Sequence, residues 1–366
     1  MILTLWVVMG LVAVTLLFSQ SALFEYRGET NRFYGYQSEA AVEGGIRYAM
    51  SVLSNLEEPG QVPDVSAYVS QEVEVGDARL WFLGRDWSVT AAPGRDPVFG
   101  FVDEASKLSL NTATVEMLQK LPNMTVEFAA AIVDWRDEDD EVTDYGAESS
   151  TYAMESPPYE AKNAPFTSTY ELLAVQGATP QILFGEDTNL NGVLDENEND
   201  GDLTPPPDNA DGALDLGILE YVTVHSLQPG EEEDDEDQEG LVNVGTAPLE
   251  VLACLPGMDE SLARQLVSYR GSLGTDALSS TDWVEEVLEG DVVSQIEDLI
   301  TSASYQFCVD VAAVGRHGGG YRRTRAIVDV SGDSPALRYR EDMTRYGWAL
   351  GETVRLDLAE EAPRIR

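Results

Sequence analysis

The sequence has 366 residues, of which 43% are hydrophobic, which is enough for about two or three globular domains. Lys and Arg number 22 against 66 Asp and Glu, so the formal net charge is -44. Such an acidic surface repels phosphate backbones and attracts cations, which argues against nucleic acid and in favour of a divalent metal as a partner. The two histidines, His225 and His317, leave little for general-base catalysis, and no enzyme activity or small-molecule substrate is expected.

The N-terminal segment is apolar and uncharged through Phe24. As a helix it spans about 36 Å, enough to cross a bilayer, so residues 1–24 are predicted to form a single transmembrane helix. No proline interrupts residues 25–56, and apolar residues recur there at helical spacing, at Val42, Ile46, Ala49, Leu53 and Leu56. The helix is therefore expected to continue over 25–58, and its face around Val42 to Leu53 is the predicted contact with partner subunits.

Strand-like runs lie at residues 79–84, 86–93 and 98–104, and similar runs return only at 304–315 and 323–331. The last two flank a glycine-rich stretch, 316–322, which is typical of a hairpin turn. Its basic residues are interpreted as a solvated hairpin or, alternatively, as a docking patch for an acidic neighbour; they are Arg316, Arg322, Arg323 and Arg325.

The middle of the chain contains an internal repeat, because residues 110–136 align without gaps on residues 244–270. Each copy predicts a helix capped by a threonine, a Leu-Pro turn and a second helix, as in helix-hairpin-helix motifs. Such motifs often bind DNA through glycine-rich turns. Here the first turn has no glycine, and the second has Asp259 and Glu260 where a phosphate would approach, so the repeats are interpreted as structural.

The stretch "DTNLNGVLDENE", residues 187–198, has the spacing of a twelve-residue calcium loop. Gly192 stands at the sixth position, where the loop bends sharply. The predicted calcium ligands are Asp187, Asn189, Asn191, the carbonyl of Val193, Asp195 and Glu198. The alternative is a chance turn in an acidic linker. No helix is expected after the loop, which favours a structural clip over a calcium sensor.

Further acidic residues follow the loop. A weaker second calcium site is predicted there from Asp200, Asp202, Asp208, Asp211 and Asp215, with Pro207 in place of its first ligand. Residues 199–212 contain three prolines and are expected to be a linker, as is the acidic run 229–240. Such segments cannot order themselves by burying apolar surface, so calcium is the expected ordering agent.

Two other groups were considered as chemical sites. The run "DWRDEDDE", residues 134–141, crowds carboxylates that could do acid–base work or bind metal, but no histidine or nucleophile motif is near it. It is interpreted as an acidic helix end that could contribute to metal binding. Cys254 and Cys308 could form a disulfide in an oxidising compartment; two small buried residues are the preferred interpretation.

Several segments together resemble the K-class minor pseudopilins of type II secretion, the general secretion pathway protein K family. They are "LTLWVVMGLVAV", "EAAVEGGIRYA", "VDEASKLSLNTA", "DWRDEDDEVTDYGAES", "YEAKNAPFTSTYELLAVQG" and "VNVGTAPLEVLACLPG". The resemblance implies an α+β pseudopilin fold, in which a long N-terminal helix packs on a small antiparallel sheet with a large α-helical insertion. The domains expected are 1–24, 25–58, 59–102, the insertion 103–300 and 301–366.

The resemblance also implies a function. K-class subunits are anchored in the bacterial inner membrane, with most of the chain in the periplasm, and cap the pseudopilus tip together with I- and J-class subunits. Members of the family bind calcium in the insertion and carry a basic leader, so this sequence is expected to begin inside the mature helix. A type IV pilus minor pilin is the main alternative, and a helix-hairpin-helix DNA-binding protein a more distant one.

Overall fold

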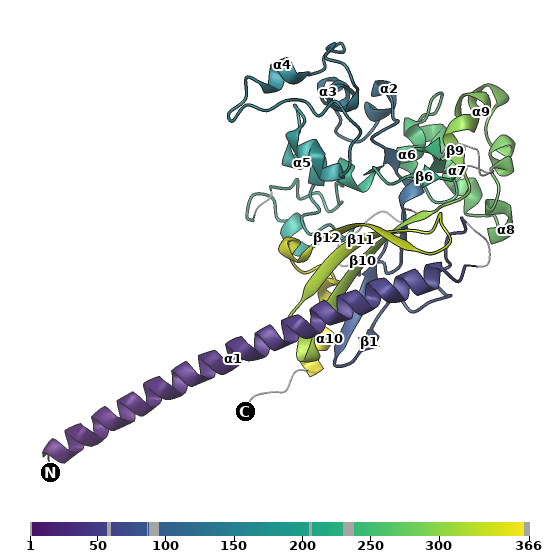
Figure 1. Ribbon diagram of the computed structural model, residues 1–366. Helices are drawn as coiled ribbons and strands as arrows, with labels where there is room; N and C mark the ends of the chain where they lie inside the picture. Colours follow the sequence, from purple (N-terminus) through teal and green to yellow (C-terminus); the bar gives the residue numbers. More distant parts are fainter. Residues whose placement is uncertain are drawn as a thin grey trace.

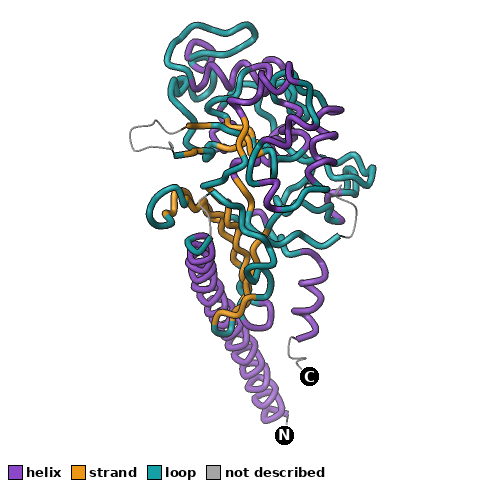
Figure 2. Tube along the Cα trace, turned by 90° about the vertical axis from the view of Figure 1, so that its right-hand side faces the viewer, coloured by secondary structure: helices purple, strands orange, loops and turns teal. Residues whose placement is uncertain are grey.

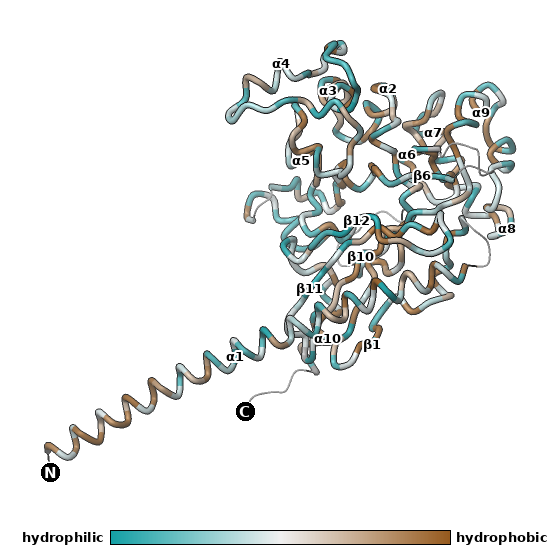
Figure 3. Tube along the Cα trace, viewed as in Figure 1, coloured by the Kyte–Doolittle hydropathy of each residue, from teal (hydrophilic) through white to brown (hydrophobic). Residues whose placement is uncertain are grey.

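The computed structural model describes residues 2–56, 60–85, 87, 95–204, 207–229 and 238–361. Its first element, α1 (Ile2–Leu53), is one continuous helix of 52 residues, as predicted, and its N-terminal part projects away from the rest of the chain (Figure 1). Figure 3 shows that this projecting part is hydrophobic and that the helix becomes more polar towards the body. Residues 57–59, where the helix was expected to end, lie outside the described part of the chain.

The C-terminal part of α1 packs on a sheet through a face of small and apolar side chains, namely Ala41, Val42, Ile46, Ala49 and Leu53, all buried. Gly45 permits this close approach, because a Cβ added there would lie 2.9 Å from Val311 Cγ1 and 3.0 Å from Leu80 Cδ2. The apolar side of this stretch is therefore not free for partner subunits, and contact through the rest of the stretch from Val42 to Leu53 stays a prediction. The same periodic apolar residues bury themselves against the chain's own sheet.

The sheet is antiparallel, with strand order β1-β2-β10-β11-β12, and β3 pairs with β10 as well. The strands are β1 (Val73–Val75), β2 (Ala78–Leu83), β3 (Val102–Asp103), β10 (Gln306–Val314), β11 (Arg322–Asp329) and β12 (Ala336–Asp342). Every residue of the central strand β10 is buried. The glycine-rich stretch joins β10 to β11, as predicted, whereas the strand expected at 86–93 lies outside the described residues except for Trp87, which is in a turn.

Both faces of the sheet are covered. In Figure 2, α1 lies along one face, and the C-terminal segment with α10 (Gly351–Glu361) lies on the other. On that second face Trp81 and Val314 pack against Ala349, Leu350 and Leu358. The sequence analysis did not predict α10, nor β12, whose residues are mostly exposed and so lack the alternation of apolar and polar side chains that marks a half-buried strand.

Residues between β3 and β10 form a helical insertion with its own apolar core. Its helices are α2 (Val115–Leu118), α3 (Val126–Arg136), α4 (Ser149–Tyr152), α5 (Pro180–Phe184), α6 (Leu249–Cys254), α7 (Glu260–Arg270), α8 (Thr275–Leu278) and α9 (Gly290–Ile296). Three strand pairs tie distant segments together: β4 (Leu108–Ser109) with β5 (Val222–Thr223), β6 (Leu227–Gln228) with β7 (Gln238–Glu239), and β8 (Val242–Asn243) with β9 (Ile300–Thr301). The acidic run thus connects β6 to β7, and its residues 230–237 are outside the described part.

The repeat forms the two helix pairs α2–α3 and α6–α7. An arginine at the end of each second helix donates to two backbone carbonyls at the start of its own copy. Arg136 bonds to the carbonyls of Leu110 and Ala113, and Arg270 to those of Val244 and Ala247. These are equivalent positions in the two copies, so the same side chain closes both units.

Helix capping differs between the two copies. Thr114 caps α2 by accepting from Met117 N–H, as predicted. In the second copy the prediction is wrong: Pro248 occupies the N-cap without a side-chain bond, and the Thr246 hydroxyl donates to the Asp103 carboxylate. Asp103 ends β3, so the second repeat is fastened to the point where the chain leaves the sheet.

The two cysteines lie in different cores. Cys254 is in α6 and Cys308 in β10, both buried and both free. Burial raises the pKa of Cys254 to about 12 and that of Cys308 to about 11, so neither is a reactive thiolate at neutral pH. The structure thus agrees with two small buried residues.

Candidate functional site

The loop of residues 187–198 follows α5 and ends in the 3-10 turn Glu196–Glu198. Its first and last ligand positions lie close together. The Asp187 carboxylate accepts from the backbone N–H of Asn191 at 3.0 Å and of Gly192 at 2.8 Å. Glu198 accepts from Thr188 N–H at 2.9 Å and Asp195 N–H at 3.1 Å. The twelfth residue thereby closes back on the first turn of the loop. Gly192 has the positive φ, +77°, that its position predicts.

The middle of the loop points its polar side chains at one another. The Nδ2 atoms of Asn189 and Asn191 both donate to Asp195 Oδ2, at 2.6 Å and 3.1 Å. Asn189 Oδ1 is buried and has no donor among the described residues. Val193, whose carbonyl is the predicted ligand, is also buried. The side chains of the third, fifth and ninth positions therefore lie in one region, with the two amide nitrogens turned to the Asp195 carboxylate, while Asn191 Oδ1 accepts from Val193 N–H.

The electrostatics of the loop favour a cation. Asp187 and Glu198 are 0% and 1% exposed. Burial raises the pKa of both, and the charges of Glu220 near Asp187 and of Asp187 near Glu198 raise them further. Two buried acids that oppose each other's ionisation are stabilised by a shared divalent ion. The residues present fit calcium.

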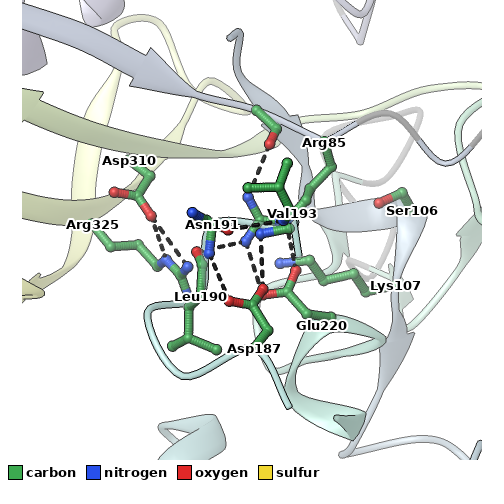
Figure 4. A network of polar contacts seen from close by, with 12 residues as sticks. Arg85, Ser106, Lys107, Asp187, Leu190, Asn191, Val193, Glu220, Asp310 and Arg325 are labelled. Carbon is green, nitrogen blue, oxygen red and sulfur yellow. Dashed lines mark hydrogen bonds and ion pairs between the residues drawn. The ribbon is translucent and has the colours of Figure 1, made fainter. Parts of the chain in front are cut away.

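Two arginines of the sheet, outside the insertion, hold the backbone of this loop. Arg323 of β11 donates to the carbonyls of Asn189 and Leu190, the latter at 2.7 Å, and Arg85 donates to the Leu190 carbonyl at 2.9 Å. Asn189 Nδ2 also reaches the Trp348 carbonyl at 3.0 Å. The loop is thus the joint between the insertion and the sheet (Figure 4).

The arginine cluster was interpreted as a solvated hairpin, and for two of its members this is wrong. Arg323 is fully buried, with Asp310 of β10 accepting from its Nε at 2.8 Å and its Nη2 at 2.7 Å. Arg325 also pairs with Asp310, at 3.1 Å. The acidic neighbour of these arginines belongs to the same chain. Arg323 and Arg325 stand two residues apart in β11 and so point to the same face of the sheet, whereas the exposed Arg316 lies in the 3-10 turn Arg316–Gly318.

A second ion pair lies beside the loop. Arg85 Nε and Nη2 donate to the two carboxylate oxygens of Glu220 at 2.8 Å and 2.9 Å, and both side chains are buried. Glu220 ends the 3-10 turn Ile218–Glu220 of the insertion, whereas Arg85 follows β2 (Figure 4). These two parallel hydrogen bonds join the insertion to the sheet. Burial alone would raise the pKa of Glu220, but the charge of Arg85 and its hydrogen bonds hold that pKa at about 2.

The predicted second site is arranged differently. Its carboxylates mainly accept backbone N–H groups: Asp208 from Asp200, Gly201 and Ala210, and Asp200 from Thr204. Asp202, Asp211 and Asp215 are exposed. Glu186, which the sequence analysis did not single out, caps this turn by accepting from Asn209 and Asp215 N–H.

One group of acidic residues meets elsewhere. Among the described residues, the cluster whose carboxylate oxygens all lie within 4.8 Å of one another is Asp134, Asp137 and Glu148. Two of these stand in the acidic run singled out from the sequence. Glu148 does not, because only the folding of residues 137–148 returns it to the end of α3.

The fold defines a class of protein. A single helix in the described chain, α1, is long and apolar enough to cross a membrane, and its apolar part is exposed. That helix packs on a small antiparallel sheet that carries a helical insertion. Residues 105–184 match the family model of type II secretion system (T2SS), protein K.

A solved structure supports the same class. It is a chain of the crystal structure of the GspK-GspI-GspJ complex from the type 2 secretion system of enterotoxigenic Escherichia coli. The TM-score is 0.52 at 15% identity, with 87% of this chain and 99% of that chain covered, which shows a shared fold. No curated protein matches the chain.

The chain is thus similar to the type II secretion system protein K family over residues 105–184 and shares its fold with a chain of the GspK-GspI-GspJ complex. Of the filament systems considered from the sequence, type II secretion is the one that the matching family model names.

Proposed function

We propose that this chain is the K-type minor pseudopilin at the tip of a type II secretion pseudopilus, where it starts and caps filament assembly for the export of folded proteins. Its partners are then the I- and J-class minor pseudopilins and the inner-membrane platform of the system. The observation that carries the proposal is the protein K match over residues 105–184, which falls inside the insertion. The GspK of the matched complex assembles with GspI and GspJ.

The shape of the molecule supports a tip position. Pseudopilin filaments grow by packing long N-terminal helices side by side, so anything bulky beyond the sheet must fit above the subunits below. The insertion lies at the opposite end of the molecule from the free end of α1 (Figures 1 and 2). A further subunit added above it would meet the insertion instead of a free helix groove. Capping follows from this steric block.

The anchoring follows from α1. Residues 1–24 cross the inner membrane once, and the bulk of the chain lies in the periplasm. In this division residues 25–58 continue the helix, 59–102 and 301–366 form the sheet domain, and 103–300 form the insertion. A strongly acidic periplasmic domain attracts the divalent cations that its loops require.

Secretion and assembly can be tested in the source bacterium. Deletion of the gene should abolish export of type II substrates, and the full-length chain should restore it. The full-length chain should also co-purify with the I- and J-type proteins from detergent-solubilised membranes. A deletion strain that secretes normally, or a chain that copurifies with neither protein, contradicts the proposal.

We further propose that calcium binds the 187–198 loop through Asp187, Asn189, Asn191, the Val193 carbonyl, Asp195 and Glu198, and so locks the insertion to the sheet. Support comes from the closed loop, the buried acids and the arginine clamp described above. A weaker second ion at Asp200, Asp202, Asp208, Asp211 and Asp215 stays a prediction, because these carboxylates already cap backbone groups.

The test of the loop uses the detergent-solubilised full-length chain after chelation. Calcium should raise its thermal midpoint and protease resistance, and Asp187→Asn or Glu198→Gln should remove most of that gain. Glu141→Gln, an exposed change elsewhere in the insertion, should leave the gain intact. If chelation alters neither quantity in the unmodified chain, calcium does not hold this joint.

A further inference from the structure

The 187–198 loop contains a pair of residues whose chemistry the proposed function does not use. Asn191 is followed by Gly192, and the Asn-Gly dipeptide occurs at no other place in the sequence. Asparagine is one of the thermally labile residues, because the backbone nitrogen of the next residue can attack its side-chain amide. Glycine in that next position has no Cβ and adopts the widest range of backbone angles, so it hinders the attack least. Asn191 is therefore the asparagine of this chain most prone to deamidation when the chain is unfolded.

Deamidation is an intramolecular step that needs only water. The backbone nitrogen of Gly192 forms a bond to Cγ of Asn191 and loses its proton, the bond from Cγ to Nδ2 breaks, and the side-chain nitrogen leaves as ammonia. Water then adds to either carbonyl of the resulting five-membered imide, which opens to an aspartate or an isoaspartate at position 191. Like other intramolecular reactions, the step depends on the geometry of the reacting atoms. A fold that holds those atoms in other bonds therefore controls the rate.

The closed loop holds both reacting groups. The attacking nitrogen is not free, since Gly192 N–H donates to Asp187 Oδ2 at 2.8 Å, and the Asn191 N–H donates to the same carboxylate at 3.0 Å (Figure 4). The amide under attack is held at both ends: Asn191 Oδ1 accepts from Val193 N–H at 2.8 Å, and Asn191 Nδ2 donates to Asp195 Oδ2 at 3.1 Å. Asn191 is also only 1% exposed, which keeps water from it. The folded loop thus protects a labile dipeptide.

Glycine at position 192 cannot be exchanged without strain. Its φ of +77° lies in the left-handed region that favours glycine. A Cβ there would also lie 3.1 Å from Cδ of Arg85, one of the two arginines that hold the loop against the sheet. The residue that permits the closed joint is therefore also the residue that makes Asn191 labile once the joint opens.

The protection depends on the contact between the insertion and the sheet. Arg323 of β11 donates to the carbonyls of Asn189 and Leu190, directly before the labile pair, and Arg85 donates to the second of them. These donors are lost when the insertion leaves the sheet, and the loop then has only its own hydrogen bonds. Local units of this kind open more often than the whole chain unfolds. Deamidation at Asn191 should thus report how often this joint opens.

We propose that Asn191 is a modification site, at which spontaneous deamidation irreversibly marks chains whose insertion has separated from the sheet. Either product opposes reclosure of the metal-free loop. An aspartate at position 191 replaces the donor to Asp195 by a second carboxylate, and the two like charges repel. An isoaspartate adds a carbon to the backbone just before Gly192, whose N–H must reach Asp187. The proposal rests on the closed loop, and neither on calcium nor on the secretion role.

The experiment measures the rate of deamidation at Asn191 in the full-length chain in detergent. The protein is incubated in a mildly alkaline buffer with calcium chloride, folded or unfolded in urea, and its peptides are analysed by mass spectrometry after digestion. Asn191 should deamidate more slowly in the folded chain than in the unfolded chain, by about tenfold or more. Asn189 lies in the same loop but precedes the branched Leu190, so it should deamidate much more slowly than Asn191 in urea. Equal rates at Asn191 in the folded and the unfolded chain overturn the proposal.

A variant with a loosened joint tests whether docking provides the protection. Arg323→Met removes a donor from the carbonyls that precede the pair, so Asn191 should deamidate several times faster than in the parent under the same folded conditions. Arg316→Met, at an exposed position, should match the parent. If both variants match the parent, contact with the sheet does not protect Asn191 and the proposal fails.

The consequence of the modification is tested with Asn191→Asp, which imitates one of the two products. In chelator this variant should have a lower thermal midpoint than the parent, and a protease should separate its insertion from the sheet more readily. Asn209→Asp adds the same charge at an exposed position outside the loop and is the matched control. Equal midpoints for the two variants would contradict the proposal.

Discussion

At the scale of the residue, Arg323 decides how the insertion meets the sheet. Its guanidinium joins Asp310 of β10 to two carbonyls of the 187–198 loop in a fully buried setting. Arginine suits this position because its planar fork can bond a carboxylate on one side and carbonyls on the other without losing its charge. A lysine could not bond all of these acceptors at once.

Replacing Arg323 with methionine should therefore destabilise the chain strongly. The change removes the arginine donor of the Asn189 carbonyl and leaves the Leu190 carbonyl with Arg85 and Asp310 with Arg325. Breaking a buried ion pair from one side costs about 3–5 kcal/mol. Thermal denaturation in calcium should show a lower midpoint, and calcium affinity should fall because the loop is no longer held. Arg316→Met, at an exposed position, is the control. Equal midpoints for the two variants would show that the clamp contributes nothing.

The Glu220–Arg85 pair predicts an acid-sensitive joint. The folded pKa of Glu220, about 2, lies below its ordinary value of 4.5, so the pair's contribution is complete above about pH 4.5 and is lost as the pH falls towards 2. Limited proteolysis between pH 5 and pH 2.5, with an acid-tolerant protease, should show the insertion loosening from the sheet.

The Glu220→Gln variant separates this effect from general acid unfolding. It leaves Arg85 buried without its counter-charge, so it should be less stable than the parent at pH 7. It should also lose less further stability between pH 5 and pH 2.5. If parent and variant decline in parallel through this window, Glu220 is not responsible.

At the scale of the element, the insertion is built from two copies of one unit. Each begins with a short strand in a parallel pair, continues through a helix hairpin, and is closed by an arginine on its own first carbonyls. Burial lowers the pKa of both Arg136 and Arg270 to about 10, which still leaves them charged at neutral pH. In both copies the hairpin packs into the apolar core of the insertion.

Methionine at either closing arginine should have a similar effect. Arg136→Met and Arg270→Met each leave two carbonyls without their donor, at about 1–3 kcal/mol for a buried unsatisfied group. Hydrogen exchange should report the loss within the affected copy and much less in the other. Arg264→Met, on the exposed face of α7, should change neither copy. Exchange that rises equally in both copies would mean that they do not fold as separate units.

At the scale of the whole molecule, the charge of -44 sets the conditions for stability. Acidic side chains outnumber basic ones three to one, and the buried Arg85 and Arg323 are each paired with a buried acid, so the excess of negative charge remains on the surface. Compact states with large net charge are destabilised by self-repulsion. Calcium at the proposed 187–198 site would relieve this repulsion locally, and dissolved salt relieves it over the whole surface.

Salt should therefore stabilise the metal-free protein. Raising sodium chloride from about 10 mM to about 150 mM shortens the screening length from about 30 Å to about 8 Å, which weakens repulsion between exposed carboxylates. The thermal midpoint in chelator should rise by several degrees, while the buried Arg85–Glu220 and Arg323–Asp310 pairs are little screened. Choline chloride should give the same rise, because the effect is screening and not sodium binding. A midpoint that falls with salt would show that exposed ion pairs outweigh the repulsion.

The sequence by itself determined the features that local pattern encodes. Helical spacing of Val42, Ile46, Ala49 and Leu53 predicted the long helix, the glycine-rich turn predicted the β10–β11 hairpin, and ligand spacing predicted a closed loop with a bend at Gly192. Each depends on residues close together in the chain. The aligned repeat predicted both helix pairs for the same reason.

Only the tertiary structure decided which partner each of these features meets. The apolar face of α1 turned out to be covered by the chain's own sheet, and Arg323 and Arg325 turned inward to Asp310. Glu148 returned to Asp134 and Asp137, and Glu220 to Arg85 across 135 residues. Burial and charge pairing depend on segments that are distant in sequence, and no spacing rule carries that information. The pairing of β12 with the edge of β11 was also decided only in the folded chain, because β12 is mostly exposed and its sequence shows no strand-like alternation.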